Sequence, residues 1–488
     1  MKRRIFVIFT SLLFNLPGSS MAAAETTPQI KPNIIYILLD DAGYGDLGCY
    51  GQKTLLTPHV DRLAAGGVKF TRHYSGSTVC APSRCVLMTG LHTGHSAIRG
   101  NGPSHLPDKD LTVARLLKNA GYHTACIGKH GLGHPAPLND PERKGFDEFF
   151  GYVGTAHAHN FYSDFLVRNG QRVPLNNQLI PGSGKKPDTG VATADGRKQW
   201  IPQLLSDDVQ RYLVERAANP AKPFYLQYSL NLPHANNEAG KTSPLGHGME
   251  TPSYGEFASR DWPDVAKGFA SAMKFIDDEV GKIMTQLDKS GLDKNTLIML
   301  SSDNGPHSEA GQDAEFFKSN GGLNGIKRDL TDGGIRVPFI VRWTGTIKPK
   351  SVSDHVSGFQ DFLPTAADLA GVSLTGECDG ISLLPTFLGN ASQQKQHLYL
   401  PWFFDEAGGK RAILQWPWKL IHLNTNSKET AAKQKTPEGR NGLTVQLFNL
   451  ESDPAEASNV ASENPQKVKE LEVFMKEAWR DPEVITSK

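Results

Sequence analysis

A cysteine, a proline and an arginine lie close together in residues 79–90, and their types suit reaction chemistry. Cys80, Pro82 and Arg84 precede an apolar run that is typical of the start of a helix. A cysteine at such a junction lies in the positive field of the helix N-terminus, and Arg84 adds a fixed cation. The segment therefore suits an anionic reaction centre. Cys80 alone could also be a buried structural thiol, half of a disulfide with Cys85, or a metal ligand.

Four apolar segments that we predict to be strands are followed by polar residues. The segments span residues 33–39, 123–128, 223–230 and 296–301, and the polar residues after them are Asp40-Asp41, Lys129, His234 and Asp303-Asn304. A nearly continuous apolar run is expected of a parallel strand that is covered on both faces. Because open α/β sheets bind ligands at the carboxyl ends of such strands, we expect these polar side chains to form one site.

The acidic strand ends offer oxygen ligands to a metal ion. Asp40, Asp41, Asp303 and Asn304 supply oxygen donors, and these two blocks contain no histidine or cysteine. Hard oxygen donors suit Ca²⁺ or Mg²⁺ better than Zn²⁺. Two adjacent carboxylates are costly unless a cation neutralises them, although a solvated turn is the alternative for the first pair taken alone.

Helical patterns alternate with the apolar strands. Residues 111–120 carry apolar side chains at helical spacing, and residues 262–287 form a longer stripe of the same kind. This alternation predicts an α/β fold in which helices sandwich a large, mainly parallel sheet.

The pattern changes near residue 388. Apolar segments at 398–404, 412–415, 418–422 and 447–450 are typical of short antiparallel strands, and residues 468–479 of an amphipathic helix. We therefore predict a catalytic α/β domain over residues 25–387 and a smaller C-terminal α+β domain, an antiparallel sheet plus a helix, over residues 388–488.

The N-terminus has the three parts of a secretory signal. Three basic residues at positions 2–4 precede an apolar run over residues 5–16 and small residues that end at Ala24. The run is too short to span a bilayer, so we predict a signal peptide over residues 1–24 and an enzyme that a bacterium secretes or exports to the periplasm.

Charge and cysteine content exclude some classes of protein. The formal net charge of +1 becomes −2 once the three basic residues of the signal are removed. A nearly neutral chain without a long basic run gives no support for binding to nucleic acid or to a membrane surface, and we expect no membrane span. The five cysteines are odd in number, so at least one is unpaired or modified.

The segment from His73 to Asn101, with Cys80 and Arg84 in its centre, resembles the signature of the type I, formylglycine-dependent sulfatases. These are arylsulfatase A-like members of the alkaline phosphatase superfamily. Further blocks of the family follow in the same order at residues 121–129, 325–329 and 333–338. The resemblance implies that Cys80 is oxidised to formylglycine (3-oxoalanine) by a formylglycine-generating enzyme, which reads a sequence that includes Pro82 and Arg84.

The resemblance also implies a metal and a mechanism. The metal is usually Ca²⁺, and its ligands would be Asp40, Asp41, Asp303, Asn304 and the modified Cys80. One hydroxyl of the hydrated aldehyde attacks sulfur and becomes sulfated, and proton loss from the other hydroxyl then expels sulfate. The metal would hold a sulfate oxygen and draw electron density from sulfur.

Four further residues take roles from the same resemblance. Lys129 and Lys327 would clamp sulfate oxygens and stabilise charge on the leaving oxygen. His234, in the sequence Asn-Leu-Pro-His, matches the sulfate-contacting histidine, and we choose it as general acid to the departing alcohol. Arg84 would stabilise the hydrate and the anion linked to the metal.

The block that contains Lys129 departs from the family pattern. His130 takes the place of a tryptophan, and Gly131 takes the place of the second catalytic histidine. The base that assists the formylglycine is therefore open, and His130, His134 and His307 are the candidates.

A histidine-rich loop at residues 155–162 is a candidate for binding substrate. His157 and His159 have the His-x-His spacing of a zinc site, but no cysteine or carboxylate stands nearby in the sequence. We prefer a loop that contacts a saccharide, and we assign His130, His157 and His159 to substrate binding. The expected substrates are sulfated sugars or polysaccharide fragments. Two alternatives stay open: a phosphate or phosphonate ester hydrolase, and a non-catalytic protein that binds sulfated glycans.

Overall fold

The computed structural model describes residues 31–102, 104–132, 139–186, 188–425 and 443–481. These described residues form one compact unit. No helix among the described residues is long and apolar enough to cross a membrane. The predicted signal peptide at residues 1–24 lies outside the described part of the chain.

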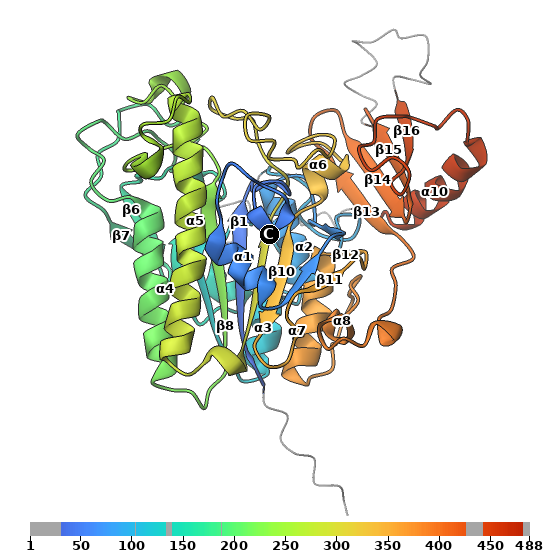
Figure 1. The fold of residues 1–488 in the computed structure, drawn as a ribbon, viewed down its shortest axis with the longest axis horizontal. Helices are drawn as coiled ribbons and strands as arrows, with labels where there is room; N and C mark the ends of the chain where they lie inside the picture. The colour runs from blue at the N-terminus through green and yellow to red at the C-terminus, as the bar shows by residue number, and fades with distance from the viewer. Residues whose placement is uncertain (1–30, 103, 133–138, 187, 426–442, 482–488) are drawn as a thin grey trace, which may run out of the picture. The chain divides into compact units, whose positions relative to one another are not determined.

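A ten-stranded sheet forms the centre of the molecule (Figure 1). Its order is β11-β2-β10-β9-β1-β8-β4-β5-β6-β7, and β9, β1, β8, β4 and β5 run parallel to one another. The strands are β1 (Asn33–Asp40), β2 (Val68–Phe70), β4 (His123–Lys129), β5 (Glu148–Tyr152), β6 (Phe165–Arg168), β7 (Gln171–Pro174), β8 (Phe224–Pro233), β9 (Thr296–Ser302), β10 (Phe339–Trp343) and β11 (Ser351–Ser353). A separate pair joins β3 (His73–Tyr74) to β12 (Ser357–Gly358).

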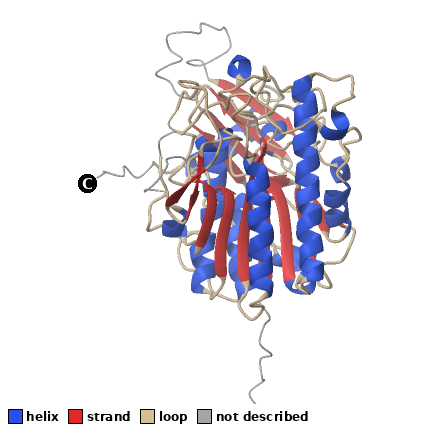
Figure 2. Ribbon diagram, turned by 90° about the vertical axis from the view of Figure 1, so that its left-hand side faces the viewer, coloured by secondary structure: helices blue, strands red, loops and turns tan. Residues whose placement is uncertain are grey.

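Helices cover both faces of this sheet (Figure 2). They are α1 (Pro58–Ala65), α2 (Cys80–Thr89), α3 (Val113–Asn119), α4 (Ile201–Ala217), α5 (Asp264–Lys289), α7 (Phe362–Ala370) and α8 (Leu384–Phe387). The short helix α6 (Asp332–Ile335) instead shares a core with residues of the C-terminal part. Side chains on β1 alternate between two cores, so that Ile35 packs with residues of α1, α4 and α5 and Ile34 with residues of α2, α3 and α7. Because β1 is buried along its whole length, its sequence is apolar without alternation.

The C-terminal part contains a four-stranded antiparallel sheet. Its strands, in order, are β13 (Leu400–Phe404), β14 (Lys410–Gln415), β15 (Trp418–Leu423) and β16 (Thr444–Asn449). One core of this sheet includes residues of α10 (Pro465–Glu477), and the other includes Tyr74 and Ile335 of the larger α/β part. The sheet therefore has both faces covered.

The predicted fold class is confirmed. The structure has a large, mainly parallel sheet between helices and a smaller antiparallel sheet with a helix at the C-terminus. A further apolar segment forms β10, which runs antiparallel to β9, a direction that its composition does not encode. The domain boundary between residues 387 and 388 stays a prediction.

Candidate active site

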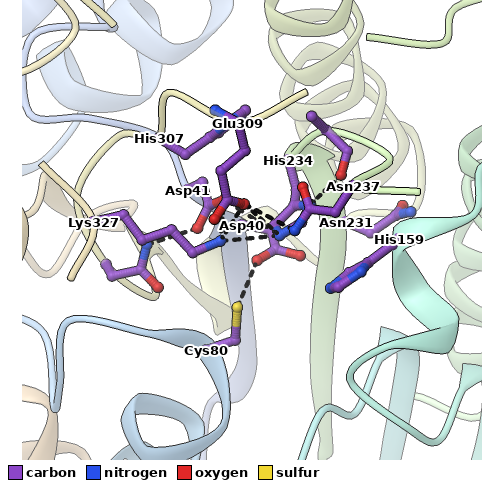
Figure 3. Close-up of polar contacts among 12 residues, drawn as sticks. Asp40, Asp41, Cys80, His159, Asn231, His234, Asn237, His307, Glu309 and Lys327 are labelled. Carbon is purple, nitrogen blue, oxygen red and sulfur yellow. Dashed lines mark hydrogen bonds and ion pairs between the residues drawn. The ribbon is translucent and has the colours of Figure 1, made fainter. Parts of the chain in front are cut away.

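The polar strand ends that we identified in the sequence meet at one edge of the sheet. The strands β9, β1, β8 and β4 are consecutive neighbours, and all four are parallel, so their carboxyl ends point the same way. Figure 3 shows Cys80, Lys327 and His234 arranged around Asp40 and Asp41. The cluster thus combines segments that are far apart in the sequence.

Cys80 is the first residue of α2 and lies directly beside an acid. Val79 before it is extended, and Cys80 Sγ lies 3.5 Å from Asp40 Oδ1. Only 1% of Cys80 is exposed. Burial raises the pKa of its thiol to about 12, so the sulfur is protonated at neutral pH. An unmodified Cys80 would therefore be a weak nucleophile.

Arg84 connects α2 to two of the strand ends. Its Nε and Nη2 lie 2.9 and 2.8 Å from Asp303 Oδ2, and its Nη1 donates to the carbonyl oxygen of Lys129 over 2.8 Å. The side chain is fully buried. Because a buried guanidinium needs such partners, these contacts fix the orientation of α2 relative to β4 and β9.

Two buried lysines each pair with one of the adjacent carboxylates. Lys129 Nζ donates to Asp40 Oδ2 over 2.7 Å, and Lys327 Nζ donates to Asp41 Oδ2 over 2.8 Å. Asp41 has a φ of 66°, a strained conformation for a residue with a side chain. Its N–H donates to Asp303 Oδ1 over 3.2 Å, which ties β1 to the end of β9.

The three carboxylates differ in their protonation. Burial raises the pKa of Asp40, but the nearby cations, above all Lys129, hold it well below its usual value. Burial also acts to raise the pKa of Asp41, but Lys327, His234 and His307 together lower it. Burial and the charge of Asp40 instead raise the pKa of Asp303 to about 7. Two charged acids and a third that resists ionisation indicate a place for a further cation.

Asn304 also offers an oxygen atom to a cation at this place. Its Nδ2 donates to Asp41 Oδ1 over 2.7 Å and to the carbonyl oxygen of Gly305 over 2.9 Å. The Oδ1 atom is buried, and no hydrogen-bond donor of the described residues reaches it. Atoms of Asp40, Asp41, Cys80 and His234 that could ligate a metal all lie within 4.8 Å of one another. This donor set, rich in carboxylate oxygens, fits a hard divalent cation.

His234 has its two ring nitrogens in different environments. Nδ1 lies 2.6 Å from the carbonyl oxygen of Ala235, so Nδ1 carries the proton that this acceptor requires. Nε2 faces Lys327 Nζ at 3.1 Å and Asp41 Oδ2 at 3.4 Å. Burial and the Lys327 charge hold the pKa of His234 well below its usual value. Nε2 is therefore the nitrogen that can take up and release a proton at the cluster.

Glu309 belongs to the cluster and escaped the sequence analysis. Its Oε2 accepts from Lys327 Nζ over 3.1 Å and from Asn237 Nδ2 over 3.0 Å, and Arg328 pairs with its other oxygen. Glu309 comes from the loop after β9 and belongs to no motif. Its only sequence signal is its place in a polar loop six residues after Asp303.

The histidines of the predicted substrate-binding set separate in the structure. His159 stacks on His234, with ring centroids 4.7 Å apart. His157 instead contacts Ser163 Oγ through Nε2 and stacks on Phe165. The structure therefore brings His159, but not His157, against the side chains of the cluster.

The other histidine candidates also have different places. His130 packs against the rings of Phe146 and Phe149, where burial lowers its pKa to about 3. His307 stacks on His234, with ring centroids 5.7 Å apart, and His134 lies outside the described residues. At Gly131, with a φ of 71°, an added Cβ would lie 2.8 Å from Arg84 Cδ, so the backbone approaches Arg84 too closely for a side chain.

Comparisons with known proteins agree with this geometry. A family model described as sulfatase matches residues 32–372, and one described as the C-terminal part of N-sulphoglucosamine sulphohydrolase matches residues 326–481. The chain is 31% identical to arylsulfatase A of Bos taurus over 481 residues, which cover 93% of this chain and 89% of the relative. It is 28% identical to N-acetylgalactosamine-6-O-sulfatase of Bacteroides thetaiotaomicron, with coverage of 90% and 92%.

A solved structure shows the same fold over nearly the whole chain. The crystal structure of Ps i-CgsB in complex with k-i-k-neocarrahexaose superposes with a TM-score of 0.73 at 25% identity, and covers 93% of this chain and 94% of that one. The resemblance that the motifs indicated is thus confirmed by sequence relatives and by the fold. The chain belongs to the sulfatase family and is a sulfuric ester hydrolase.

Proposed function

We propose that the protein hydrolyses sulfate esters of sugars or polysaccharide fragments, with a formylglycine formed from Cys80 and a bound Ca²⁺. The observation that carries this proposal is the position of Cys80, which lies beside Asp40 while two buried ammonium groups pair with the adjacent carboxylates. The relatives support a sugar substrate, since one is an N-acetylgalactosamine-6-O-sulfatase and one solved structure holds a neocarrahexaose.

The state of Cys80 supports its conversion. The thiol is free of any disulfide to a described cysteine and is protonated at neutral pH, so it would react poorly as it stands. A hydrated aldehyde at this position would supply an oxygen nucleophile. Because only 1% of Cys80 is exposed, the formylglycine-generating enzyme must act before the chain has folded.

The cluster of oxygen ligands supports a bound metal. Asp40, Asp41, Asp303, Asn304 and the modified residue 80 would hold the cation, and Ca²⁺ suits this set better than Mg²⁺ because Ca²⁺ accepts more protein oxygens and a looser geometry. The cation would act as a Lewis acid on a sulfate oxygen. The observation that most specifically supports this site is the buried Oδ1 of Asn304, which no donor of the described residues reaches.

Lys129 and Lys327 would then bind the sulfate group. Both ammonium groups pair with carboxylates in the structure. With a divalent cation held by Asp40 and Asp41, the two lysines would have N–H donors available to sulfate oxygens. Arg84 keeps Asp303 and α2 in place.

His234 would protonate the departing alcohol. Its Nδ1 proton is held by the carbonyl oxygen of Ala235, so any second proton resides on Nε2, which faces the cluster. The ring is neutral in the structure because burial and Lys327 lower its pKa. An anionic sulfate ester beside Nε2 favours the protonated ring, which places the acid where the alcohol leaves.

The export of the enzyme is a further part of the proposal. It rests on the signal-like residues 1–24. A secreted or periplasmic location would give the enzyme access to sulfated polysaccharide fragments outside the cell.

The reaction can be tested with paired substrates. Nitrophenyl sulfate and nitrophenyl phosphate differ in the group transferred but release the same phenol. We expect turnover of the sulfate to exceed that of the phosphate at equal concentration, and treatment with a chelator to remove it. A preference for the phosphate would overturn the proposal in favour of a phosphate or phosphonate ester hydrolase.

A further inference from the structure

A buried acid lies behind the imidazole that stacks on His234. Glu238 is 6% exposed, and its Oε2 lies 3.4 Å from His159 Nδ1. No hydrogen-bond donor of the described residues reaches Glu238 Oε2, and the same holds for the neighbouring Asn237 Oδ1. Two buried acceptor atoms in consecutive residues thus have no donor within the part of the chain that the structure describes.

Unsatisfied buried acceptors are costly, and they cluster where a ligand completes them. A buried acceptor oxygen without a donor has lost its hydrogen bonds to water and has gained none within the protein. His159 Nδ1 lies 3.4 Å from Glu238 Oε2 but makes no hydrogen bond to it, since this nitrogen is itself without a partner among the described residues. The pKa of Glu238 is itself lowered despite its burial, so the acid is charged. A hydroxyl or N–H donor from outside the chain would satisfy either oxygen.

These acceptors adjoin the side of the cluster where the alcohol departs. His159 stacks on His234, which we place as the proton donor to that alcohol. Asn237 donates through Nδ2 to Glu309, which contacts Lys327. Figure 3 shows Asn237 and His159 on the side of His234 opposite Lys327. The acceptor atoms are therefore next to the departing group rather than next to Cys80.

We propose that Asn237 and Glu238, together with His159, form the subsite for the sugar that leaves, and that this subsite selects against a second anionic group. It takes a ring whose positions beside the sulfate ester carry hydroxyl or amide N–H donors. It rejects a ring that carries another sulfate or a carboxylate there, because that group offers no donor and faces the Glu238 carboxylate. This inference rests on the proposed function, since it names the substrate class of the same site.

The test compares two substrates on one preparation of enzyme. The substrates are monosulfated N-acetylgalactosamine and the same sugar with a second sulfate on the adjacent hydroxyl. We expect the wild type to favour the first by at least about tenfold in kcat/KM, which is the order expected of a like-charge contact. Glu238→Gln keeps the shape but removes the charge, and should reduce this preference at least about fivefold.

Two control variants test whether the change in the ratio of the two kcat/KM values is specific to the charge of Glu238. Glu238→Asp keeps the charge and should keep the preference, and Glu463→Gln removes an exposed acid of the C-terminal part and should leave the ratio at its wild-type value. Because both substrates are measured on the same preparation, a loss of folded protein cancels from the ratio. A wild type without the preference, or a Glu238→Gln ratio equal to that of the wild type, would overturn the subsite.

A binding measurement separates this inference from the proposed function. Calorimetry with the Cys80→Ala protein records the affinity for the same two sugars without turnover. Tighter binding of the monosulfated sugar supports the subsite even if the unmutated enzyme turns over no sulfate ester at all, which is the result that would refute the proposed function alone. Equal binding of the two sugars refutes the subsite whatever the turnover.

Discussion

Lys129 Nζ donates to Asp40 Oδ2 over 2.7 Å, and neither side chain is exposed to solvent. The contact connects β4 to β1 across the end of β8, which lies between them in the sheet. Removing one partner of a buried ion pair leaves the other charge without compensation, and this costs more than the pair itself contributes. The site is therefore coupled to the stability of the fold at this point.

Lys129→Met should destabilise the metal-free protein. Without the ammonium, Asp40 remains buried beside Cys80 with only a long contact to Arg84 Nη2 at 3.7 Å. We expect the free energy of unfolding in urea and a chelator to fall by about 3–5 kcal/mol, and calcium to restore part of it. Lys348→Met, at an exposed lysine, is the matched control. Equal free energies of unfolding for the Lys129 variant and the wild type would show that the ion pair is not needed for stability.

Asn304→Ala should weaken the response to calcium. The substitution removes the buried Oδ1 that has no donor among the described residues. Saturation with Ca²⁺ at about 100 times its dissociation constant should stabilise the wild type by about 2.7 kcal/mol, and the variant much less at the same concentration. Differential scanning calorimetry with and without Ca²⁺ measures this. Asn219→Ala, on the surface, should respond as the wild type does, and a full response of the Asn304 variant would remove Asn304 from the metal site.

The residues that the sequence could place are those at the ends of apolar strands. β1, β4, β8 and β9 are covered on both faces, so each has a continuous apolar run whose end is visible in the sequence. Parallel pairing then places the ends together, which is why Asp40, Lys129 and Asp303 could be assigned to one site before the structure was known.

Other elements and site residues have weaker signals in the sequence. β7 (Gln171–Pro174) is short and largely exposed, and α4 carries many charged residues, so neither was identified. Glu309 and Glu238 come from loops, and the path by which a loop returns to the site depends on tertiary contacts rather than on periodicity. His157 and His159 share one motif, but the two rings pack in different places.

His234→Gln should affect substrates according to their leaving group. An alkyl alcohol needs a proton as it departs, whereas nitrophenol is acidic enough to depart as an anion. We expect kcat on a sulfated sugar to fall by about 10²–10⁴ and kcat on nitrophenyl sulfate to fall much less. His307→Gln, at the ring stacked on His234, serves as the comparison and should not show this dependence. An equal loss on both substrates would argue that His234 binds sulfate rather than donating a proton.

Glu456→Gln should change how stability depends on pH. Glu456 lies 2.8 Å from Lys419 Nζ, and Lys419 also pairs with Asp332 at 2.7 Å. Burial, opposed by Lys419 but reinforced by Asp332, raises the pKa of Glu456 to about 7 from 4.5. The native protein therefore holds a proton that the unfolded chain has released. The contribution of this proton to the free energy of unfolding is complete below about pH 4.5 and is lost as the pH rises through about 7.

Urea unfolding across this range measures the effect. Between about pH 4.5 and about pH 7 the wild type should lose up to about 3 kcal/mol that the Gln variant does not lose. Parallel curves for the two proteins would show that Glu456 keeps its ordinary pKa in the folded state.

The conversion of Cys80 can be measured directly by mass spectrometry of the peptide that contains it, from protein made in its native host. Because conversion to an aldehyde exchanges sulfur and hydrogen for oxygen, we expect a peptide lighter than the cysteine form by about 18 Da, in a fraction that rises with the specific activity of the preparation. An active preparation in which this peptide carries only unmodified cysteine would contradict a formylglycine-dependent reaction.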